Sequence, residues 1–306
     1  MKNQKLLGNL LLTLTALIWG TAFVFQRVGM ESIEPITFTS VRMALGACAA
    51  GGAGLLLGGR RGRPVADRAK KRATLLGGVC CGLFLTAASI FQQVGIVTTT
   101  AGKAGFITAL YILLVPLLRL LLFRKRSGLH VWLAIAAGVV GLYLLCMTEG
   151  FTLTRGDTLI CLCALVFSGH ILCCDYFSRR GDPVRIAAIQ FLTVAAVSGL
   201  IALLFEQPNW EKLRAAAVPI LYCGCISAGV GYTLQMVAQS RTDPTVASLL
   251  MSLEAVFAVL AGALFLDERM SRRELLGCAI MFAAIILVQL PIPSRRAAGR
   301  RASCKQ

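Results

Sequence analysis

The sequence predicts an all-α integral membrane protein whose ten transmembrane helices form two inverted repeats of five. Composition indicates the class, because 57% of the 306 residues are hydrophobic and 15% are charged, against about 25% charged residues in an ordinary soluble domain. The mean hydropathy is +0.76. A spanning helix needs about 20 apolar residues, so the chain has room for about ten with short loops. Soluble, disordered, collagen-like and disulfide-stapled folds are excluded.

Apolar runs between charged or Pro/Gly-rich breaks define the expected helices. The first run follows Lys2 and Lys5, as in a signal peptide. It has no clear small-residue cleavage site and continues to Arg27, so we interpret it as a retained span. The expected helices cover residues 6–27, 35–58, 73–97, 101–123, 129–149, 156–177, 184–205, 214–239, 244–267 and 272–290.

The charge balance is strongly basic, with 31 Lys and Arg residues against 14 Asp and Glu residues. In a soluble protein this excess would indicate nucleic acid. Here the basic residues lie in short gaps between apolar runs, so we expect anionic lipid headgroups as partners and no nucleic acid. With the N-terminus in the cytoplasm, 21 basic residues lie on the cytoplasmic side and seven on the other. This bias predicts a multi-pass protein of the cell inner (cytoplasmic) membrane with both termini cytoplasmic.

The chain also resembles itself at a nearly constant offset. GNLLLTLTALIWG at residues 8–20 is similar to GDTLICLCALVFS at residues 156–168, 148 residues further on. In the later part of each half the offset becomes 143. The positions that this comparison pairs are Pro35 with Pro183, Arg42 with Gln190, Gln92 with Gln235, Leu110 with Leu253 and Tyr111 with Glu254.

These pairs predict two homologous halves of five spans each. We expect the first repeat at residues 1–149, the second at 150–290 and a basic cytoplasmic tail at 291–306. Five is an odd number, so the second half enters the membrane with the opposite polarity. Inverted repeats of this kind are typical of secondary transporters, which bind their substrate near the membrane midplane.

Four stretches carry a family resemblance: LIWGTAFVFQR at residues 17–27, EPITFTSVRMAL at 34–45, QQVGIVTTTAGKAGFITALYILLVP at 92–116 and the long segment from Gln235 to Gly277. The last contains a proline helix start at Pro244, the intramembrane Glu254 and an Asp-Glu-Arg turn. These stretches resemble the drug/metabolite transporter (DMT) superfamily, in particular its EamA-like ten-span members. The resemblance covers about residues 6–290 and implies a secondary transporter of small metabolites, often an exporter. It does not specify the solute.

Glu254 is the foremost candidate for function because it lies near the middle of the ninth expected span. Charged groups at that depth are rare and usually face a cavity or a partner. Glu254 is therefore expected to couple transport to protons or to bind a cationic substrate group; the alternatives are a hydrogen bond to a neighbouring helix or an ion pair with Arg42. Arg42 itself would bind a substrate carboxylate or tie helices together.

Polar and aromatic side chains on several helical faces complete the expected site. Trp19 and Gln26 share a face of the first helix, and Tyr232, Gln235 and Gln239 share one of the eighth. Such residues join helices or line a wet cavity. The substrate-binding or coupling residues predicted from the sequence are Glu254, Trp19, Gln92, Tyr111, His170, Tyr232, Gln235 and Arg42.

The twelve cysteines indicate neither a disulfide framework nor a cofactor site. Nearly all lie in apolar runs and no CxxC pair occurs, so small packing residues are the simplest interpretation. Cys163, His170 and Cys174 share one helix face, where a soft metal would still need a fourth ligand. We therefore expect no metal and no cofactor.

The predicted function is a secondary transporter, an exporter of small polar or amphipathic metabolites by alternating access, with proton coupling. A channel or facilitator using the same central cavity is the alternative, and it would differ by showing no saturation or counterflow. An intramembrane enzyme would need a nucleophile and base pair or a metal motif; Ser168 and His170 are too close in sequence to pair on one face. The protein is therefore not expected to be an enzyme. A homodimer is left open.

Overall fold

The computed structural model describes residues 2–58, 68–98, 101–125, 127–146, 154–265 and 271–289. These residues form helices and turns, with no strand among them. The sequence leaves a basic loop at residues 59–72 between the second and third expected helices. Residues 59–67 of it lie outside the described residues, as does the basic tail at 291–306.

The helices follow the predicted ranges to within a few residues. In chain order they are α1 (Lys2–Gly29), α2 (Pro35–Gly58), α3 (Arg68–Ile96), α4 (Ala101–Ala109), α5 (Tyr111–Phe123), α6 (Leu129–Cys146), α7 (Arg155–Ser178), α8 (Pro183–Phe205), α9 (Trp210–Ala215), α10 (Ala217–Leu221), the π-helix η1 (Tyr222–Tyr232), α11 (Thr233–Gln239), α12 (Pro244–Met251), α13 (Glu254–Phe265) and α14 (Arg272–Gln289). The short α9 was not expected from the sequence.

Seven helical stretches of the described chain are long and apolar enough to cross a membrane, and residues 129–145 form a shorter apolar helix. Large apolar side chains face outward from these helices; on α8, Leu203 and Phe205 are 73% and 80% exposed. In water such a surface would be unfavourable, whereas lipid tails solvate it. The chain is a multi-pass α-helical membrane protein.

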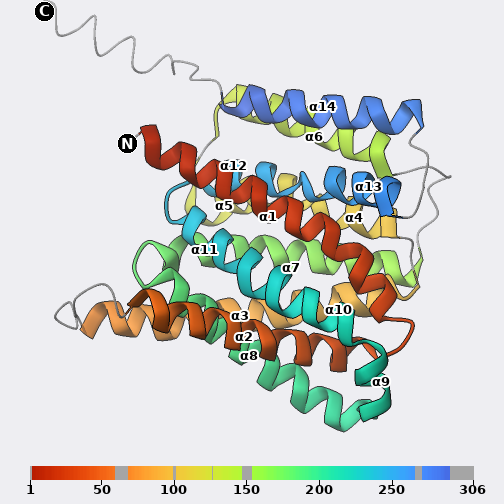
Figure 1. The fold of residues 1–306 in the computed structure, drawn as a ribbon. Helices are drawn as coiled ribbons and strands as arrows, with labels where there is room; N and C mark the ends of the chain where they lie inside the picture. Colours follow the sequence, from red (N-terminus) through yellow and green to blue (C-terminus); the bar gives the residue numbers. More distant parts are fainter. Residues whose placement is uncertain are drawn as a thin grey trace, which may run out of the picture.

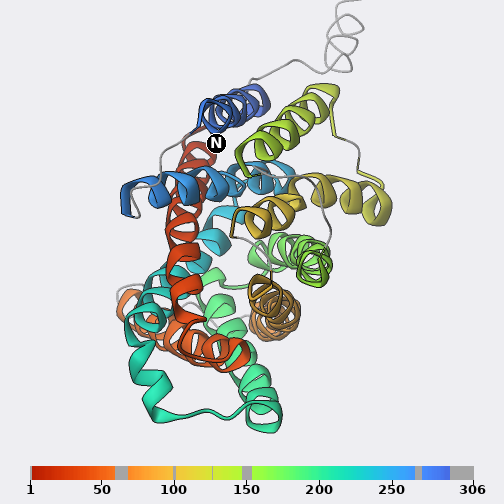
Figure 2. The ribbon, with the colours of Figure 1, turned by 90° about the vertical axis from the view of Figure 1, so that its right-hand side faces the viewer.

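The helices run side by side in a layered bundle (Figure 1). The α6–α14 pair forms one edge, and α2 and α8 lie toward the opposite edge, with α1, α7 and η1 between them (Figures 1 and 2). The α6–α14 contact depends on glycine: a Cβ added to Gly277 would lie 2.7 Å from the carbonyl oxygen of Gly141. Small residues of this kind let two membrane helices approach closely.

Two of the expected spans are broken, and they break at positions that the repeat pairs. The fourth span divides at Leu110, between α4 and α5, and the ninth at Ser252 and Leu253, between α12 and α13. At each break the backbone tightens, with Leu110 N–H donating to Ile107 and Leu253 N–H to Leu250. The first residues of the helices that resume there are Tyr111 and Glu254.

Polar contacts join the first and second halves of the chain at the end of the bundle where α9 lies. The Glu206 carboxylate accepts hydrogen bonds from Ile36 N–H at 2.9 Å and Thr37 N–H at 2.6 Å, and so caps the N-terminus of α2. Lys212 in α9 forms an ion pair with Glu34, just before α2. Helix α2 is thus held at its start by residues of the second half.

Candidate functional site

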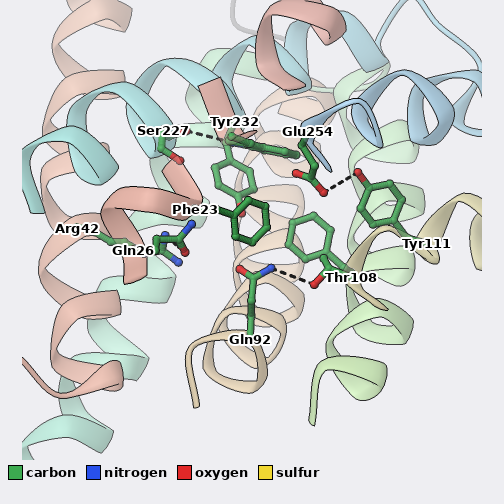
Figure 3. A pocket seen from close by; sticks show the side chains of 11 residues that line it. Phe23, Gln26, Arg42, Gln92, Thr108, Tyr111, Ser227, Tyr232 and Glu254 are labelled. Carbon is green, nitrogen blue, oxygen red and sulfur yellow. Dashed lines mark hydrogen bonds between the residues drawn. The ribbon is translucent and has the colours of Figure 1, made fainter. Parts of the chain in front are cut away.

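A pocket opens where the two broken spans meet α1, α2, α3, α7 and η1 (Figure 3). It encloses about 350 Å³ of space, open mouth included. Its lining combines aromatic rings with one acid, one arginine and several uncharged polar groups. The lining residues are Trp19, Phe23, Gln26, Arg42, Gln92, Thr108, Tyr111, Phe167, Ser227, Tyr232 and Glu254.

Glu254 and Tyr111 meet at the two helix breaks. The Tyr111 hydroxyl donates a hydrogen bond to Glu254 Oε1 at 3.0 Å, and the two side chains point toward each other in Figure 3. Both residues are almost completely buried. Because each is the first residue of the helix that resumes after a break, the breaks are what bring this pair to the centre of the bundle.

Arg42 lies across the pocket from Glu254 (Figure 3). Its Nη1 donates to Gln26 Oε1 at 3.0 Å, and its guanidinium carbon lies 5.6 Å from the centre of the Phe38 ring. Its Nε has no hydrogen-bond partner among the described residues, and no ion pair within them joins it to Glu254. A buried guanidinium with a free donor is suited to a carboxylate or another anionic group.

Aromatic rings form the wall between the Glu254 carboxyl group and the Arg42 guanidinium group. The Trp19 ring centre is 4.5 Å from that of Tyr232 and 6.2 Å from that of Phe167, which in turn is 6.1 Å from that of Tyr111. The Trp19 indole N–H donates to the Ser227 carbonyl of the π-helix at 3.4 Å. These rings offer a large apolar contact area that the hydrogen bond orients.

Six of the eight residues predicted for the site line this pocket: Glu254, Trp19, Gln92, Tyr111, Tyr232 and Arg42. Gln92 donates to the Thr108 hydroxyl at 3.4 Å. His170 and Gln235 are not in the lining, although both are fully buried. The His170 ring lies 6.2 Å from that of Tyr232, and its Nε2 is 3.1 Å from Gln190 Oε1.

Three of the cysteines, Cys81, Cys173 and Cys174, meet between α3 and α7. Cys81 Sγ lies 3.4 Å from Cys173 Sγ, and Cys174 Sγ lies 3.3 Å from His170 Nε2. Among the described residues, no group of three or more His, Cys, Asp or Glu side chains is placed to hold a metal ion.

Five lining residues were not predicted: Phe23, Gln26, Thr108, Phe167 and Ser227. Two of them left a signal in the sequence. Gln26 shares a helix face with Trp19, and Phe167 is the residue that the 148-residue offset pairs with Trp19. Ser227 left none, because it contributes through the carbonyl that accepts from Trp19.

The fold and this pocket define a class, the multi-pass helical membrane proteins with a polar site enclosed among their spans. Comparison with known proteins gives the family. The sequence model of the EamA-like transporter family matches twice, at residues 6–147 and 154–290. The chain belongs to the EamA-like transporter family, within the drug/metabolite transporter superfamily.

Individual relatives agree with this assignment. An uncharacterized transporter of Archaeoglobus fulgidus is 30% identical over 293 residues, which cover 94% of this chain and 88% of that protein. The uncharacterized inner membrane transporter YedA of Escherichia coli K12 is 27% identical, with 90% of this chain and 88% of YedA covered. A solved crystal structure has the same fold, with a TM-score of 0.74 at 19% identity over 91% of this chain and 95% of the other. These names describe transporters rather than enzymes, so the chain is a membrane transporter by family.

Proposed function

We propose that this protein is a secondary transporter that exports small polar or amphipathic metabolites across the cytoplasmic membrane by alternating access, coupled to protons. The observation that carries the proposal is the Tyr111–Glu254 hydrogen bond, formed where two broken spans meet at paired positions of the repeat. Discontinuous helices at the repeat interface are typical of secondary-transporter binding sites.

The helix packing supports ten spans in two inverted repeats at residues 1–149 and 150–290. The ten spans would be the seven long apolar stretches, the shorter apolar helix at residues 129–145, and the helices α2 and α14. Helices α2 and α6 each pack against their own counterparts, α8 and α14. Helix α3 packs against α7 and α8, and the counterpart segment containing η1 packs against α1 and α2. This exchange of partners is what a pseudo-two-fold axis produces, and the double match of the family model points the same way.

The pocket supports the substrate class. A solute with an anionic group would bind Arg42, a cationic group or a coupling proton would bind Glu254, and an apolar portion would contact the rings of Trp19, Phe167 and Tyr232. Glu254 is 4% exposed and its described partner is the uncharged Tyr111. Ionisation there is unfavourable without a positive partner, which is why proton exchange at Glu254 provides a means of coupling.

The orientation follows from the basic residues. Both termini are proposed to be cytoplasmic, with α9 on the outer side and the basic loops facing anionic headgroups. Apolar outer faces such as that of α8 contact lipid, and a homodimer formed through such a face is the alternative.

Reconstitution in proteoliposomes tests this function. The purified protein is screened against a metabolite panel by thermal shift, and each ligand found is then assayed for flux with and without a pH gradient. A carrier gives saturable flux, counterflow from vesicles preloaded with solute, and acceleration by the gradient. Flux that neither saturates nor shows counterflow would indicate a channel and refute the carrier. Saturable flux whose rate is the same with and without the pH gradient would refute proton coupling.

A further inference from the structure

We propose that a second polar binding site, lined by Gln235, Gln190 and His170, forms the cytoplasmic half of the solute pathway and is closed in this structure. The proposal rests on the function proposed above. The site would take uncharged hydrogen-bonding groups of the solute, such as hydroxyl, amide or carbonyl groups, together with water.

The first argument is the position of the pocket along the membrane normal. Gln26 lies within about one turn of the end of α1 at Gly29, and Gln92 lies about one turn before the end of α3 at Ile96. Both ends are opposite the chain's N-terminus. The pocket therefore occupies the middle and outer part of the bundle, and a complete pathway needs an inner part.

The second argument is unsatisfied polarity in the inner part. Gln235 is fully buried, and neither its amide nitrogen nor its oxygen has a hydrogen-bond partner among the described residues. The Gln190 amide nitrogen and the Gln239 side-chain oxygen are also buried without partners there. A buried polar group with no partner is destabilising, so stability does not explain three such glutamines in one region.

These glutamines belong to one region between α7, α8 and α11. The Tyr232 ring lies 6.2 Å from His170 on α7 and 6.0 Å from Phe191 on α8. Gln239 donates to the Ile171 carbonyl of α7 at 3.3 Å. Gln235 shares the helix face of Tyr232 and Gln239, so it is directed toward the same region.

The third argument is the repeat. The offsets pair Gln235 with Gln92 and Gln190 with Arg42, and both of those partners line the outer pocket. If the repeats exchange conformations during transport, the residues that face the outer pocket in one state are replaced by their counterparts in the other. The exchange also changes the chemistry, because the inner site has the neutral Gln190 where the outer one has the Arg42 cation. An anionic solute group is therefore held tightly on the outer side only.

A polar latch closes the inner end. Arg119 on α5 forms an ion pair with Asp243 at 2.7 Å, which joins the two halves. Arg179 on α7 donates to the carbonyl oxygens of Ser240 at 3.2 Å and Thr242 at 2.8 Å. Opening the site to the cytoplasm requires these contacts to separate.

The test is side-specific thiol labelling with a membrane-impermeant maleimide. Gln235→Cys, Gln92→Cys and the control Met236→Cys are each made in a background with the native cysteines replaced. Met236 is the next residue on α11 and is equally buried, but it points away from the face of Gln235. Right-side-out and inside-out vesicles are labelled separately, and membrane abundance is measured for each variant.

We expect Gln92→Cys to react from outside, Gln235→Cys to react from the cytoplasmic side, and Met236→Cys to react from neither. Adding Arg119→Ala should raise the cytoplasmic labelling rate of Gln235→Cys about fivefold, the population shift that corresponds to about 1 kcal/mol for one lost ion pair. Failure of Gln235→Cys to react from the cytoplasmic side with or without Arg119→Ala, or reaction from outside, would overturn the proposal.

The outcome is separable from the proposed function, which is decided by flux. Saturable flux of the wild-type protein with an unreactive Gln235→Cys would leave the transporter standing and remove the inner site. Two-sided labelling as expected, with flux that does not saturate, would keep the inner pathway and assign it to a channel.

Discussion

Replacing Glu254 by glutamine separates a functional carboxyl from a structural one. The substitution preserves volume and an oxygen that accepts the 3.0 Å hydrogen bond from Tyr111, but it abolishes ionisation. One neutral hydrogen bond contributes about 1 kcal/mol, and most of it is retained, so we expect the free energy of unfolding to change by less than about 1 kcal/mol. The variant should reach the membrane at the wild-type level.

Transport should respond far more strongly. A charge-assisted hydrogen bond that a cationic solute group donates to the Glu254 carboxylate contributes about 1.5–3 kcal/mol, so its loss predicts a decrease in flux of about 10- to 150-fold. If Glu254 carries the coupling proton, the wild-type flux depends on pH and the residual flux of Glu254→Gln does not. The assay is uptake or efflux of a carried solute in proteoliposomes between about pH 6 and about pH 8.

Tyr111→Phe is the matched control because it removes only the donor of the same hydrogen bond. We expect it to lower flux by about fivefold, which corresponds to about 1 kcal/mol, and to leave the pH dependence in place. If Glu254→Gln transported at the wild-type rate across the whole pH range, the proposed role of Glu254 would be refuted. Arg42 would then be the residue expected to be essential for transport.

Four further predictions concern topology, an ion pair, helix packing and the cysteines. A reporter fused after Gln306 should be cytoplasmic and one inserted at residues 207–209 external; an external C-terminus would contradict the ten-span model. Lys212 donates a hydrogen bond to Glu34 and thereby lowers the pKa of the Glu34 carboxyl from its ordinary value of 4.5. The ion pair therefore stabilises the folded protein fully above pH 4.5, and this contribution disappears as the pH falls through the lowered pKa. Because the Lys212 side chain is 42% exposed, Lys212→Met should destabilise the protein by no more than about 1 kcal/mol at neutral pH. If the wild-type protein and Lys212→Met differed in melting temperature as much at pH values well below the lowered pKa as at neutral pH, the ion pair would not be the cause. Gly277→Leu places a side chain against the Gly141 carbonyl and should destabilise the protein by about 1–3 kcal/mol, whereas an unchanged melting temperature would show that α6 and α14 can separate without cost. Replacement of all twelve cysteines by Ala or Ser should leave folding and transport largely intact. If the wild-type protein bound a stoichiometric metal ion that the cysteine-free variant lacked, the assignment of the cysteines as packing residues would be wrong.

Much of the helix plan could be predicted because it depends on local composition. Proline starts and apolar runs located α2 and α12 at the residues where the structure begins them, and α8 within one residue of its start. The helix breaks were less accessible: neither Leu110 nor Leu253 is a residue that interrupts a helix by its own propensity. They are broken where the two spans meet each other, which is a property of packing and not of the segment.

The candidate site divides in the same way. Glu254, Arg42 and Trp19 could be selected from the sequence because a polar or large aromatic group in an apolar run is conspicuous. Phe23 could not, since an apolar ring that lines a pocket and one that faces lipid are alike in sequence. Phe167 could be reached only through its pairing with Trp19 in the repeat. The backbone carbonyl of Ser227, which accepts from Trp19, is invisible to any pattern of side chains.

The sequence by itself determined that this protein lies in a membrane, where its helices are and which positions of its two halves resemble each other, because hydropathy and periodicity are local properties that each segment carries in any context. Only the tertiary structure decided that Tyr111 and Glu254 share a hydrogen bond, that Arg42 donates a hydrogen bond to Gln26, and that His170 and Gln235 lie outside the pocket. Those distinctions depend on which faces of distant helices meet, and that is settled by close packing across the whole bundle.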